Sequence, residues 1–357
     1  MIEKIIWQRA ITLAKKGALT CAPNPMVGAV LVKGGKIIGE GYHIKAGSPH
    51  AEVRALRDAF RKGHDPKGAT LFVTLEPCST TGRTPPCTEA IINAKIAEVR
   101  IGTTDPNPKH RGRAVKILEA CKIKVRVENF PECAALNERF NHFMKTGRPF
   151  IHAKWAMSLD GKMAAKEGER YSITNEKSLR EAHKLRALYD AVLIGKGTVL
   201  ADDPALSIRL SKKVRQPYKI ILDSRATLSY TGRLTEKTEA SKIIVAVSKK
   251  APEKRVLALR ERGLTVIRTS GTSVNLPELL KALGALGISG ILVEGGPKIL
   301  SAFFAENLVD KISVFIAPKI LGGKVFPLPE NLRVPKLLKN FSLRRIKDDL
   351  LFEGYPK

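Results

Sequence analysis

The chain has 357 residues, of which 62 are Lys or Arg and 34 are Asp or Glu, so its formal net charge at pH 7 is +28. This length predicts two or three domains, each large enough to bury a core. The sequence has no run of about 18 apolar residues and no apolar leader, which argues against a membrane protein and favours a cytoplasmic one. Its five cysteines, an odd number, argue against a disulfide framework.

The positive charge by itself suggests a polyanionic partner. However, basic residues are spread along the chain rather than gathered in one tract. Aromatic residues make up only 6% of the sequence, too few for a base-stacking platform. A nucleic acid is therefore not expected as the main partner. We interpret most of the charge as solvated surface, part of which attracts small phosphorylated ligands.

Apolar periodicity predicts alternating helices and strands in the first half of the chain. The expected elements are, in order, a helix over 5–16, strands over 27–33 and 36–39 joined at Gly34-Gly35, a helix opened by Pro49, a strand over 71–75, a helix capped by Thr84, a strand over 99–102, a helix over 114–120, a strand over 123–127 and a helix over 132–145. This alternation predicts a sheet between two layers of helices. Because Gly147 and Pro149 end the last helix, we place a domain boundary between residues 146 and 147.

A set of metal-binding residue types lies in this half. His50 and Glu52 fall at the start of a predicted helix, Cys78 follows a predicted strand, and Cys87 falls in the first turn of the next helix. One imidazole and two thiolates fill three tetrahedral positions on Zn²⁺ and leave the fourth for a water. Glu52 can then move protons from that water to a leaving amine. The set favours hydrolytic deamination on zinc.

These residues also carry a resemblance. His50-Ala51-Glu52 with Pro77-Cys78 and Cys87 resembles the signature of the zinc-dependent cytidine deaminase superfamily, although residues 79–86 here stand where that signature has only two residues. Three segments, the string over 74–87, Pro23-Asn24-Pro25 and the string over 39–43, resemble the bifunctional deaminase/reductase family of riboflavin biosynthesis. The resemblance implies a cytidine-deaminase-like α/β/α sandwich over residues 1–146. It also implies deamination of a diaminopyrimidinone ribosylamino phosphate, with a substrate contact at Asn24.

The second half again alternates apolar runs with helical stretches. Strands are expected over 150–155, 190–195, 218–223, 242–247 and 290–294, which predicts a mainly parallel sheet with helices on both faces. Residues 293–297 form a strand end and a two-glycine turn before a helix over 298–306, where backbone amides can hold a phosphate. The half lacks a G-x-G-x-x-G motif, so the turn alone does not indicate a Rossmann site.

Several segments of this half resemble the reductase domain of the same family, namely 158–161, 198–206, 222–225 and 294–296. The resemblance implies a dihydrofolate-reductase-like α/β domain over residues 147–357 that reduces the ribosyl chain to ribityl with NADPH. The implied NADPH contacts are Ala156, Thr198, Asp202, Ser224, Arg225, Gly295, Gly296 and Pro297, with Ser224 and Arg225 near the adenosine 2′-phosphate and the glycine turn under the pyrophosphate. The implied substrate contacts are Arg170, Arg186, Leu206, Arg209 and Glu294. Arg170 and Ser172 stand where the family commonly has serine and tryptophan, and Tyr171 is a candidate for the missing aromatic face.

Three functions fit parts of these patterns. The bifunctional deaminase/reductase accounts for both halves, with Zn²⁺ and NADPH as cofactors, a small phosphorylated pyrimidine as substrate and a homo-oligomer as the expected assembly. A nucleic-acid base deaminase of the tRNA type with an appended binding domain suits the charge, but the second half is typical of a nucleotide-cofactor fold. A non-catalytic, zinc-stabilised binding protein would keep the metal ligands and would not need Glu52. Measuring zinc content and NADPH binding together separates the three.

Overall fold

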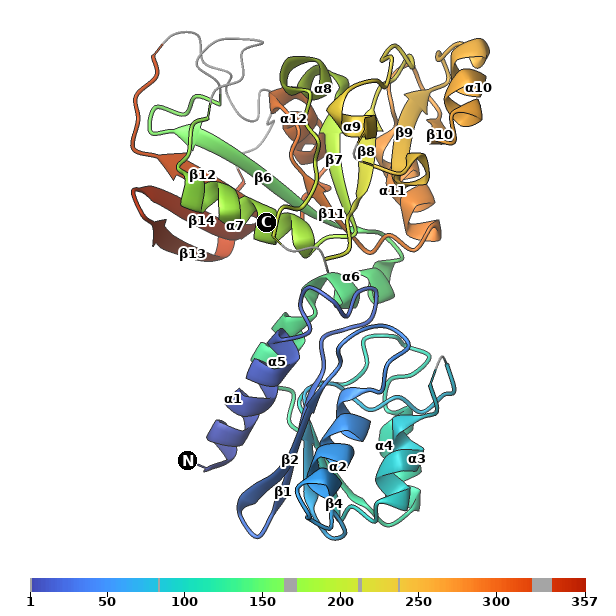
Figure 1. Cartoon of the computed structure of the whole chain (residues 1–357), viewed down its shortest axis with the longest axis vertical. Helices are drawn as coiled ribbons and strands as arrows, with labels where there is room; N and C mark the ends of the chain where they lie inside the picture. The colour runs from blue at the N-terminus through green and yellow to red at the C-terminus, as the bar shows by residue number, and fades with distance from the viewer. Residues whose placement is uncertain (1, 83, 164–171, 211–213, 237, 323–335) are drawn as a thin grey trace. The chain divides into compact units, whose positions relative to one another are not determined.

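The computed structural model of the chain describes all residues except 1, 83, 164–171, 211–213, 237 and 323–335. The chain forms two compact units, residues 1–146 (unit 1) and residues 147–357 (unit 2), each drawn in Figure 1. In the part of the chain that the structure describes, no helix is both long and apolar enough to cross a membrane.

Unit 1 alternates helices and strands as expected. Its elements are α1 (Ile2–Lys15), β1 (Gly28–Lys33), β2 (Lys36–Tyr42), α2 (Ala51–Arg61), β3 (Thr70–Val73), α3 (Cys87–Asn93), β4 (Glu98–Ile101), α4 (Arg113–Ala120), β5 (Lys124–Val127), α5 (Pro131–Leu136) and α6 (Glu138–Thr146). The strands form one sheet in the order β2-β1-β3-β4-β5, in which β1 is antiparallel to β2 and β3, and β3, β4 and β5 are parallel.

Alternate residues of the central strands of unit 1 face opposite layers of helices. Val30 and Phe72 pack with α1 and α5, whereas Leu31 and Leu71 pack with α2, α3 and α4. Figure 1 shows these two groups of helices on opposite sides of the sheet. The predicted α/β/α sandwich is confirmed.

The end of unit 1 differs from the prediction. One helix was predicted over 132–145, but the structure has two, α5 and α6, separated at Asn137. The Asn137 side-chain oxygen accepts a hydrogen bond from the Met26 backbone N–H at 2.8 Å, and its amide nitrogen donates to the Met26 carbonyl at 2.9 Å. These residues are 111 positions apart. The single-helix prediction was wrong because local periodicity carries no signal of such a contact.

We expect Asn137→Ala to destabilise unit 1. Asn137 is only 7% exposed, and alanine would leave the Met26 N–H and C=O without this partner. An unsatisfied buried polar group costs about 1–3 kcal/mol. Urea unfolding followed by circular dichroism measures the loss, with the exposed Asn93→Ala as control. Equal free energies of unfolding for the two variants would show that the Met26 contact does not stabilise the fold.

Unit 2 contains the remaining elements. They are β6 (Phe150–Ser158), α7 (Glu176–Ala187), β7 (Ala191–Gly195), α8 (Lys196–Asp202), β8 (Tyr218–Leu222), α9 (Arg233–Glu236), η1 (Ala240–Lys242), β9 (Ile243–Ser248), α10 (Glu253–Glu261), β10 (Thr265–Thr269), α11 (Leu276–Ala285), β11 (Gly290–Val293), α12 (Pro297–Ala305), β12 (Lys311–Ala317), β13 (Leu338–Ile346) and β14 (Asp349–Pro356). Among the described residues the sheet order is β10-β9-β8-β7-β11-β6-β12-β14-β13. Neighbours from β10 to β12 are parallel, and β14 is antiparallel to both β12 and β13.

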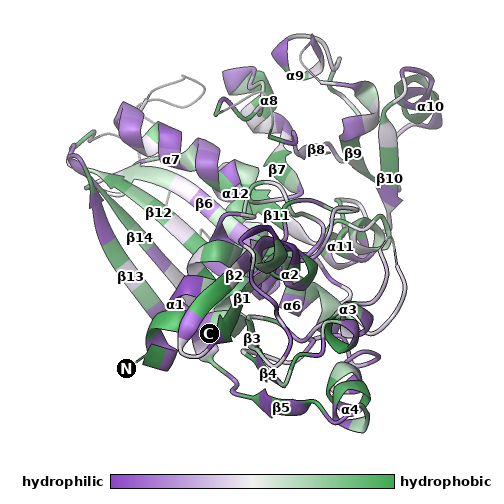
Figure 2. Cartoon of the chain, turned by 60° about the horizontal axis from the view of Figure 1, so that its bottom comes forward, coloured by the Kyte–Doolittle hydropathy of each residue, from purple (hydrophilic) through white to green (hydrophobic). Residues whose placement is uncertain are grey.

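The central strands of unit 2 are buried on both faces. Leu193 and Ile220 pack with α11 and α12, whereas Ile194 and Ile221 pack with α9 and α10. Figure 2 accordingly colours β7 and β11 as mainly hydrophobic, in contrast to the mainly hydrophilic α7. The mainly parallel sheet with two covered faces is therefore confirmed. Its parallel strands end at one common edge, which we call the carboxyl edge.

Candidate functional sites

The first site begins at the start of α2. His50 is the N-cap residue of this helix, and Glu52 lies in its first turn. The helix packs closely on β2 at Gly41, where a Cβ atom would lie only 2.2 Å from the carbonyl oxygen of Ala51. A glycine at this position therefore lets α2 begin next to the sheet, and this fixes the position of His50 and Glu52.

The two cysteines come from the ends of neighbouring elements. Cys78 lies in the loop after β3, and Cys87 is the first residue of α3, as predicted. The predicted N-cap, Thr84, is wrong, since Pro86 is the residue at that position. A proline disfavours helical geometry in the residue before it, so the helix cannot readily start at Pro85. The backbone N–H of Cys87 donates to the Cys78 sulfur at 3.2 Å.

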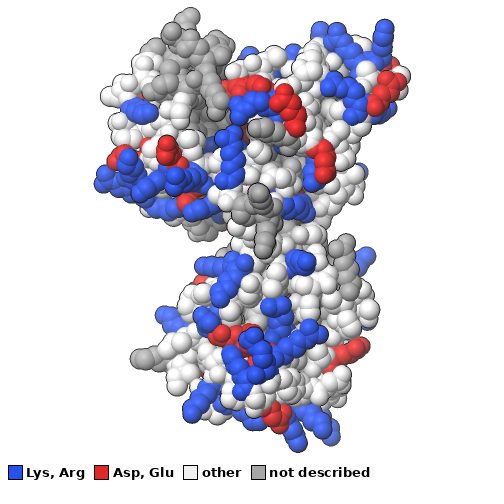
Figure 3. Space-filling model, viewed as in Figure 1, with Lys and Arg blue, Asp and Glu red and all other residues white. Residues whose placement is uncertain are grey.

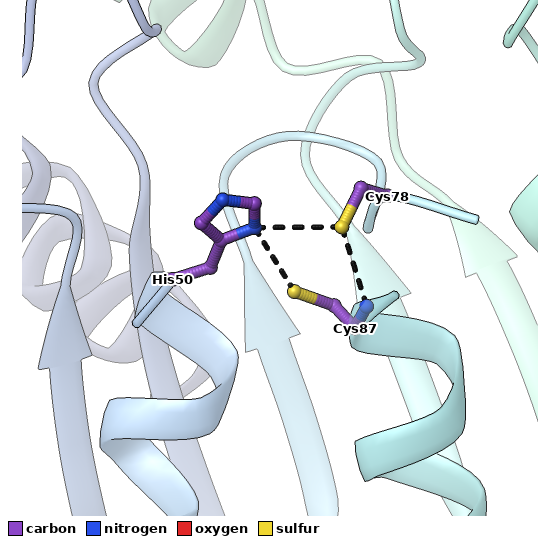
Figure 4. Close-up of side chains that lie close together, drawn as sticks. All are labelled: His50, Cys78 and Cys87. Atoms are coloured by element: carbon purple, nitrogen blue, oxygen red, sulfur yellow. Dashed lines mark hydrogen bonds between the residues drawn. The ribbon is translucent and has the colours of Figure 1, made fainter. Parts of the chain in front are cut away.

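The three side chains point toward one another, as Figure 4 shows. Nδ1 of His50 lies 3.2 Å from Sγ of Cys87 and 3.4 Å from Sγ of Cys78. All three ligand atoms lie within 4.8 Å of one another. A tetrahedral zinc, with bonds of about 2.0 Å to nitrogen and about 2.3 Å to sulfur, holds nitrogen and sulfur about 3.5 Å apart. The cluster therefore fits zinc in both size and donor type.

Hydrogen bonds within the cluster favour a thiolate. Contact with the Cys87 thiol, helped by the His50 ring and the Cys87 backbone amide, lowers the pKa of Cys78 despite its burial. The same contacts with Cys78 raise the pKa of His50 and that of Cys87. Since the thiolate is the form that binds metal, Cys78 is prepared as a ligand.

Glu52 is a buried carboxylate beside this cluster. It is 3% exposed, and burial together with the nearby Cys78 sulfur raises its pKa to about 7. The nearby Cys87 side chain partly offsets this increase in the pKa. A carboxyl group that titrates near neutral pH can both accept and release a proton, as general acid/base chemistry requires.

Further polar side chains border the cluster. The amide nitrogen of Asn24 lies 3.0 Å from Nε2 of His43, and the His43 ring packs edge-on against His50 with centroids 5.1 Å apart. The structure thus brings the predicted substrate residue Asn24 to the metal cluster. Thr84 also borders the cluster, with its Oγ1 3.4 Å from Nε2 of His50. Neither His43 nor Thr84 was predicted as a site residue. The only available signal for His43 was the family-like string over 39–43.

A second buried carboxylate holds the loop next to the cluster. Glu76 is 4% exposed and lies two residues before Cys78. Its oxygens accept from the backbone N–H groups of Asp105 and Gly112, both at 3.0 Å, and of Ala114 at 3.1 Å. The loop after β4 is thereby attached to the segment that carries Cys78. Sequence reasoning missed this residue because its partners lie up to 38 positions away.

The predicted NADPH residues of unit 2 gather along the carboxyl edge. Ala156 lies on β6, Thr198 and Asp202 on α8 directly after β7, Ser224 and Arg225 after β8, and Gly295, Gly296 and Pro297 between β11 and α12. The strands β8, β7, β11 and β6 are adjacent in the sheet. Open α/β sheets bind ligands beyond the carboxyl ends of their strands, so this is the expected place for a dinucleotide.

The two-glycine turn starts α12 as predicted. Gly296 is its N-cap and Pro297 its first residue. At Gly295 a Cβ atom would lie 2.6 Å from Cβ of Ile299, so a larger residue would push the turn off the helix. At Gly296 the nearest atom to such a Cβ is Oγ1 of Thr198, at 3.9 Å. The backbone amides of this helix start can therefore be approached closely by a phosphate.

A largely buried ion cluster lies beside this turn. Arg186 donates to both oxygens of Glu294, at 2.5 and 3.0 Å, and Nζ of Lys154 lies 3.5 Å from the same carboxylate. Burial alone would raise the pKa of Glu294, but the two cations hold it at about 2. The structure thus joins the predicted residues Arg186 and Glu294. Lys154, on β6, was not predicted as a site residue because nothing in its local sequence separates it from other lysines.

The other predicted substrate residues are placed differently. Leu206 is 4% exposed and packs in the core of unit 2, so only its backbone is available to a ligand. Arg209 is exposed and lies near His183. Burial lowers the pKa of the His183 imidazole, and the positive charges of Arg186 and Arg209 lower it further. Arg170 and Tyr171 lie outside the described residues.

Unit 1 has the site of a zinc-dependent deaminase. Its α/β/α sandwich holds one imidazole and two thiols beside a buried carboxylate, which is the residue set of this class of enzyme.

Comparison with known proteins agrees. Residues 3–103 match the cytidine and deoxycytidylate deaminase zinc-binding region, and residues 149–352 match the RibD C-terminal domain. The riboflavin biosynthesis protein RibD of Aquifex aeolicus is 46% identical over 322 residues, which cover 90% of this chain and 88% of that protein.

Two solved structures are similar over nearly the whole chain. Form 1 of Acinetobacter baumannii RibD has a TM-score of 0.88 at 35% identity, covering 98% of this chain and 97% of that one. The diaminohydroxyphosphoribosylaminopyrimidine deaminase/5-amino-6-(5-phosphoribosylamino)uracil reductase of Thermotoga maritima has a TM-score of 0.85 at 36% identity, covering 100% and 99%. The chain belongs to the RibD family of riboflavin biosynthesis, which combines a zinc-dependent deaminase with an NADPH-dependent reductase.

Family membership decides among the three functions considered above. The alternative of a tRNA-type deaminase is not favoured, because unit 2 is a reductase domain rather than an RNA-binding module. Lys and Arg side chains are scattered over the face drawn in Figure 3, interspersed with acidic and uncharged residues. The non-catalytic alternative does not account for the buried Glu52 beside the metal ligands.

Proposed function

We propose that this chain deaminates a diaminopyrimidinone ribosylamino phosphate in unit 1 and reduces the resulting uracil derivative in unit 2. The deaminase reaction is supported by one observation, the buried Glu52 beside His50, Cys78 and Cys87. The second half rests on the gathering of the predicted NADPH residues along the carboxyl edge. The Thermotoga maritima relative is named for the same two reactions.

In the deaminase step, His50, Cys78 and Cys87 would hold zinc, which when bound supplies a Lewis acid that activates water at neutral pH. Glu52 takes a proton from the attacking water and delivers it to the exocyclic amine, which leaves as ammonia. Its pKa of about 7 suits both halves of this transfer. Asn24, whose amide contacts His43, would orient the pyrimidine at the same cluster.

In the reductase step, the residues along the carboxyl edge would hold NADPH, which when bound would supply a hydride to C1 of the ring-opened ribosyl imine while the imine nitrogen takes up a proton. The chain itself binds and orients the two partners. The Gly295-Gly296 turn offers backbone amides to the pyrophosphate, and the Arg186–Glu294–Lys154 cluster offers fixed charges to the substrate.

A mass-spectrometric assay tests both steps. The purified chain is incubated with the pyrimidine ribosylamino phosphate, with and without NADPH. Without NADPH we expect only the deaminated uracil derivative, and with NADPH we expect its ribityl form. An unchanged substrate under both conditions would overturn the proposed substrate, and deamination without any reduction would overturn the role of unit 2.

We further predict that Arg225→Ala weakens NADPH binding about 10–100-fold and leaves NADH binding nearly unchanged. Arg225 is exposed and follows β8 at the carboxyl edge, where its guanidinium can pair with the adenosine 2′-phosphate. A charge-assisted hydrogen bond to phosphate accounts for an effect of this size. Fluorescence titration with both cofactors measures it, and small, equal effects on the two would remove Arg225 from the site.

A further inference from the structure

A cavity of about 510 Å³ lies at the carboxyl edge of unit 2, lined by Arg225, Thr227, Lys250, Pro252 and Arg255. The residues come from three places. Arg225 and Thr227 follow β8, Lys250 follows β9, and Pro252 and Arg255 belong to the start of α10. Lys250 and Arg255 were not predicted as site residues. The volume is within the range of pockets that hold a small ligand, about 300–1,000 Å³.

The lining of this cavity is positive. Three of its five residues are cations and none is acidic. The acidic residue in the first turn of α10, Glu253, pairs with Arg268 at 2.5 Å. A fourth cation, Lys196, reaches the wall and donates from Nζ to Oγ1 of Thr227 at 2.8 Å. The cavity therefore presents an unbalanced positive charge, which favours an anionic ligand.

Hydrogen bonds join the two backbone segments that carry Arg225 and Lys250. The backbone N–H and the hydroxyl of Ser248 both donate to the carbonyl of Ser224, at 3.0 and 2.8 Å. The N–H of Lys250 donates to the same hydroxyl at 3.2 Å. Asp223, which is 2% exposed, accepts from the side chain of Thr227 at 3.1 Å. The turns that carry Arg225 and Lys250 are thus joined before any ligand arrives, which lowers the ordering cost of binding.

The cavity also lies at a suitable distance from the glycine turn. β8 and β11 are separated in the sheet only by β7, and neighbouring strands lie about 4.8 Å apart. The end of β8 is therefore about 10 Å from the end of β11 across the edge, a distance that one dinucleotide spans. A ligand with its pyrophosphate on the Gly295-Gly296 turn can place its adenosine end in the cavity.

We propose that Lys250 and Arg255 are specificity-determining residues that, with Arg225, bind the adenosine 2′-phosphate and so select NADPH over NADH. This inference rests on the proposed function of unit 2. A 2′-phosphate is a compact anion that three converging cations can share. The neutral 2′-hydroxyl of NADH leaves their mutual repulsion unrelieved.

The test compares Lys250→Ala, Arg255→Ala and the double variant with two matched controls. Lys249→Ala and Lys254→Ala remove exposed cations from the neighbouring positions, which are not among the residues that line the cavity. Each variant of the full chain is titrated with NADPH and NADH, and with their adenosine fragments 2′,5′-ADP and 5′-AMP. We expect each single variant to weaken NADPH and 2′,5′-ADP about 10-fold and the double variant about 100-fold or more. Binding of NADH and 5′-AMP should change by less than about twofold in all of them, which also shows that the fold is intact.

Two failures are distinguishable. If the unmodified chain binds NADPH more tightly than NADH but the double variant keeps that ratio, Lys250 and Arg255 do not select the phosphate, while the proposed cofactor stands. If the unmodified chain binds both cofactors equally, the proposed cofactor preference fails and the inference fails with it. A loss of NADPH affinity in the two controls as large as in the cavity variants would reduce the effect to general surface charge and overturn the assignment.

Discussion

Glu52→Gln is expected to keep its zinc and to lose deamination by about 10²–10⁴-fold. The amide has the shape of the carboxyl group, so the first turn of α2 and the ligand His50 should stay in place. It cannot carry a proton from water to the leaving amine. Metal analysis and single-turnover deamination of the pyrimidine substrate, measured on the same preparation, separate these two properties.

Two controls make this result specific to Glu52. Glu89→Gln changes a carboxylate in the first turn of α3, beside Cys87, but on the exposed side of the helix, so deamination should stay near normal. Reduction of already deaminated substrate by the Glu52 variant should also be unchanged, since that reaction belongs to unit 2. If Glu52→Gln deaminates at the normal rate, another group activates the water.

The metal cluster is the part of the site that sequence predicted best. His50, Cys78 and Cys87 stand beside sharp local signals, since each lies next to a proline or at the start of a helix. Helix starts and strand ends are set within a few residues, so local patterns place the ligands on the correct elements. The same holds for the Gly295-Gly296 turn, where a strand, two glycines and a proline follow one another.

Contacts between distant segments could not be predicted in this way. The break at Asn137 depends on Met26, and the attachment of the loop after β4 depends on Glu76. Lys154 acquires its role only because β6 and β11 are neighbours in the sheet, which brings it to Glu294. Each is a buried or partly buried polar group whose partner is determined by tertiary packing, and no spacing along the chain encodes that partner.

The cations of the positive cavity could not all be predicted from the sequence either. Sequence placed Arg225 at a strand end, but Lys250 and Arg255 are two among 62 basic residues. Only the pairing of β8 with β9, and the turn from β9 into α10, brings them to one pocket. In a chain with so many basic residues, the sequence alone does not show which few cations line the same cavity.

Cys87→Ser is expected to remove zinc and deaminase activity together while leaving unit 2 able to reduce deaminated substrate. A serine hydroxyl is the same shape but does not ionise near neutral pH, so the site loses one of its two anionic ligands. It also loses the sulfur contacts to His50 at 3.2 Å and to the Cys78 side chain, which prepare the remaining ligands.

The matched control is Cys121→Ser, because Cys121 is exposed and lies at the end of α4, away from the cluster that binds the metal. Zinc measured by plasma mass spectrometry should fall from one per chain to near zero in the first variant and stay at one in the second. Full occupancy in Cys87→Ser would show that a different side chain completes the site, and a loss of NADPH-dependent reduction in the same variant would show that the metal stabilises more than the deaminase unit.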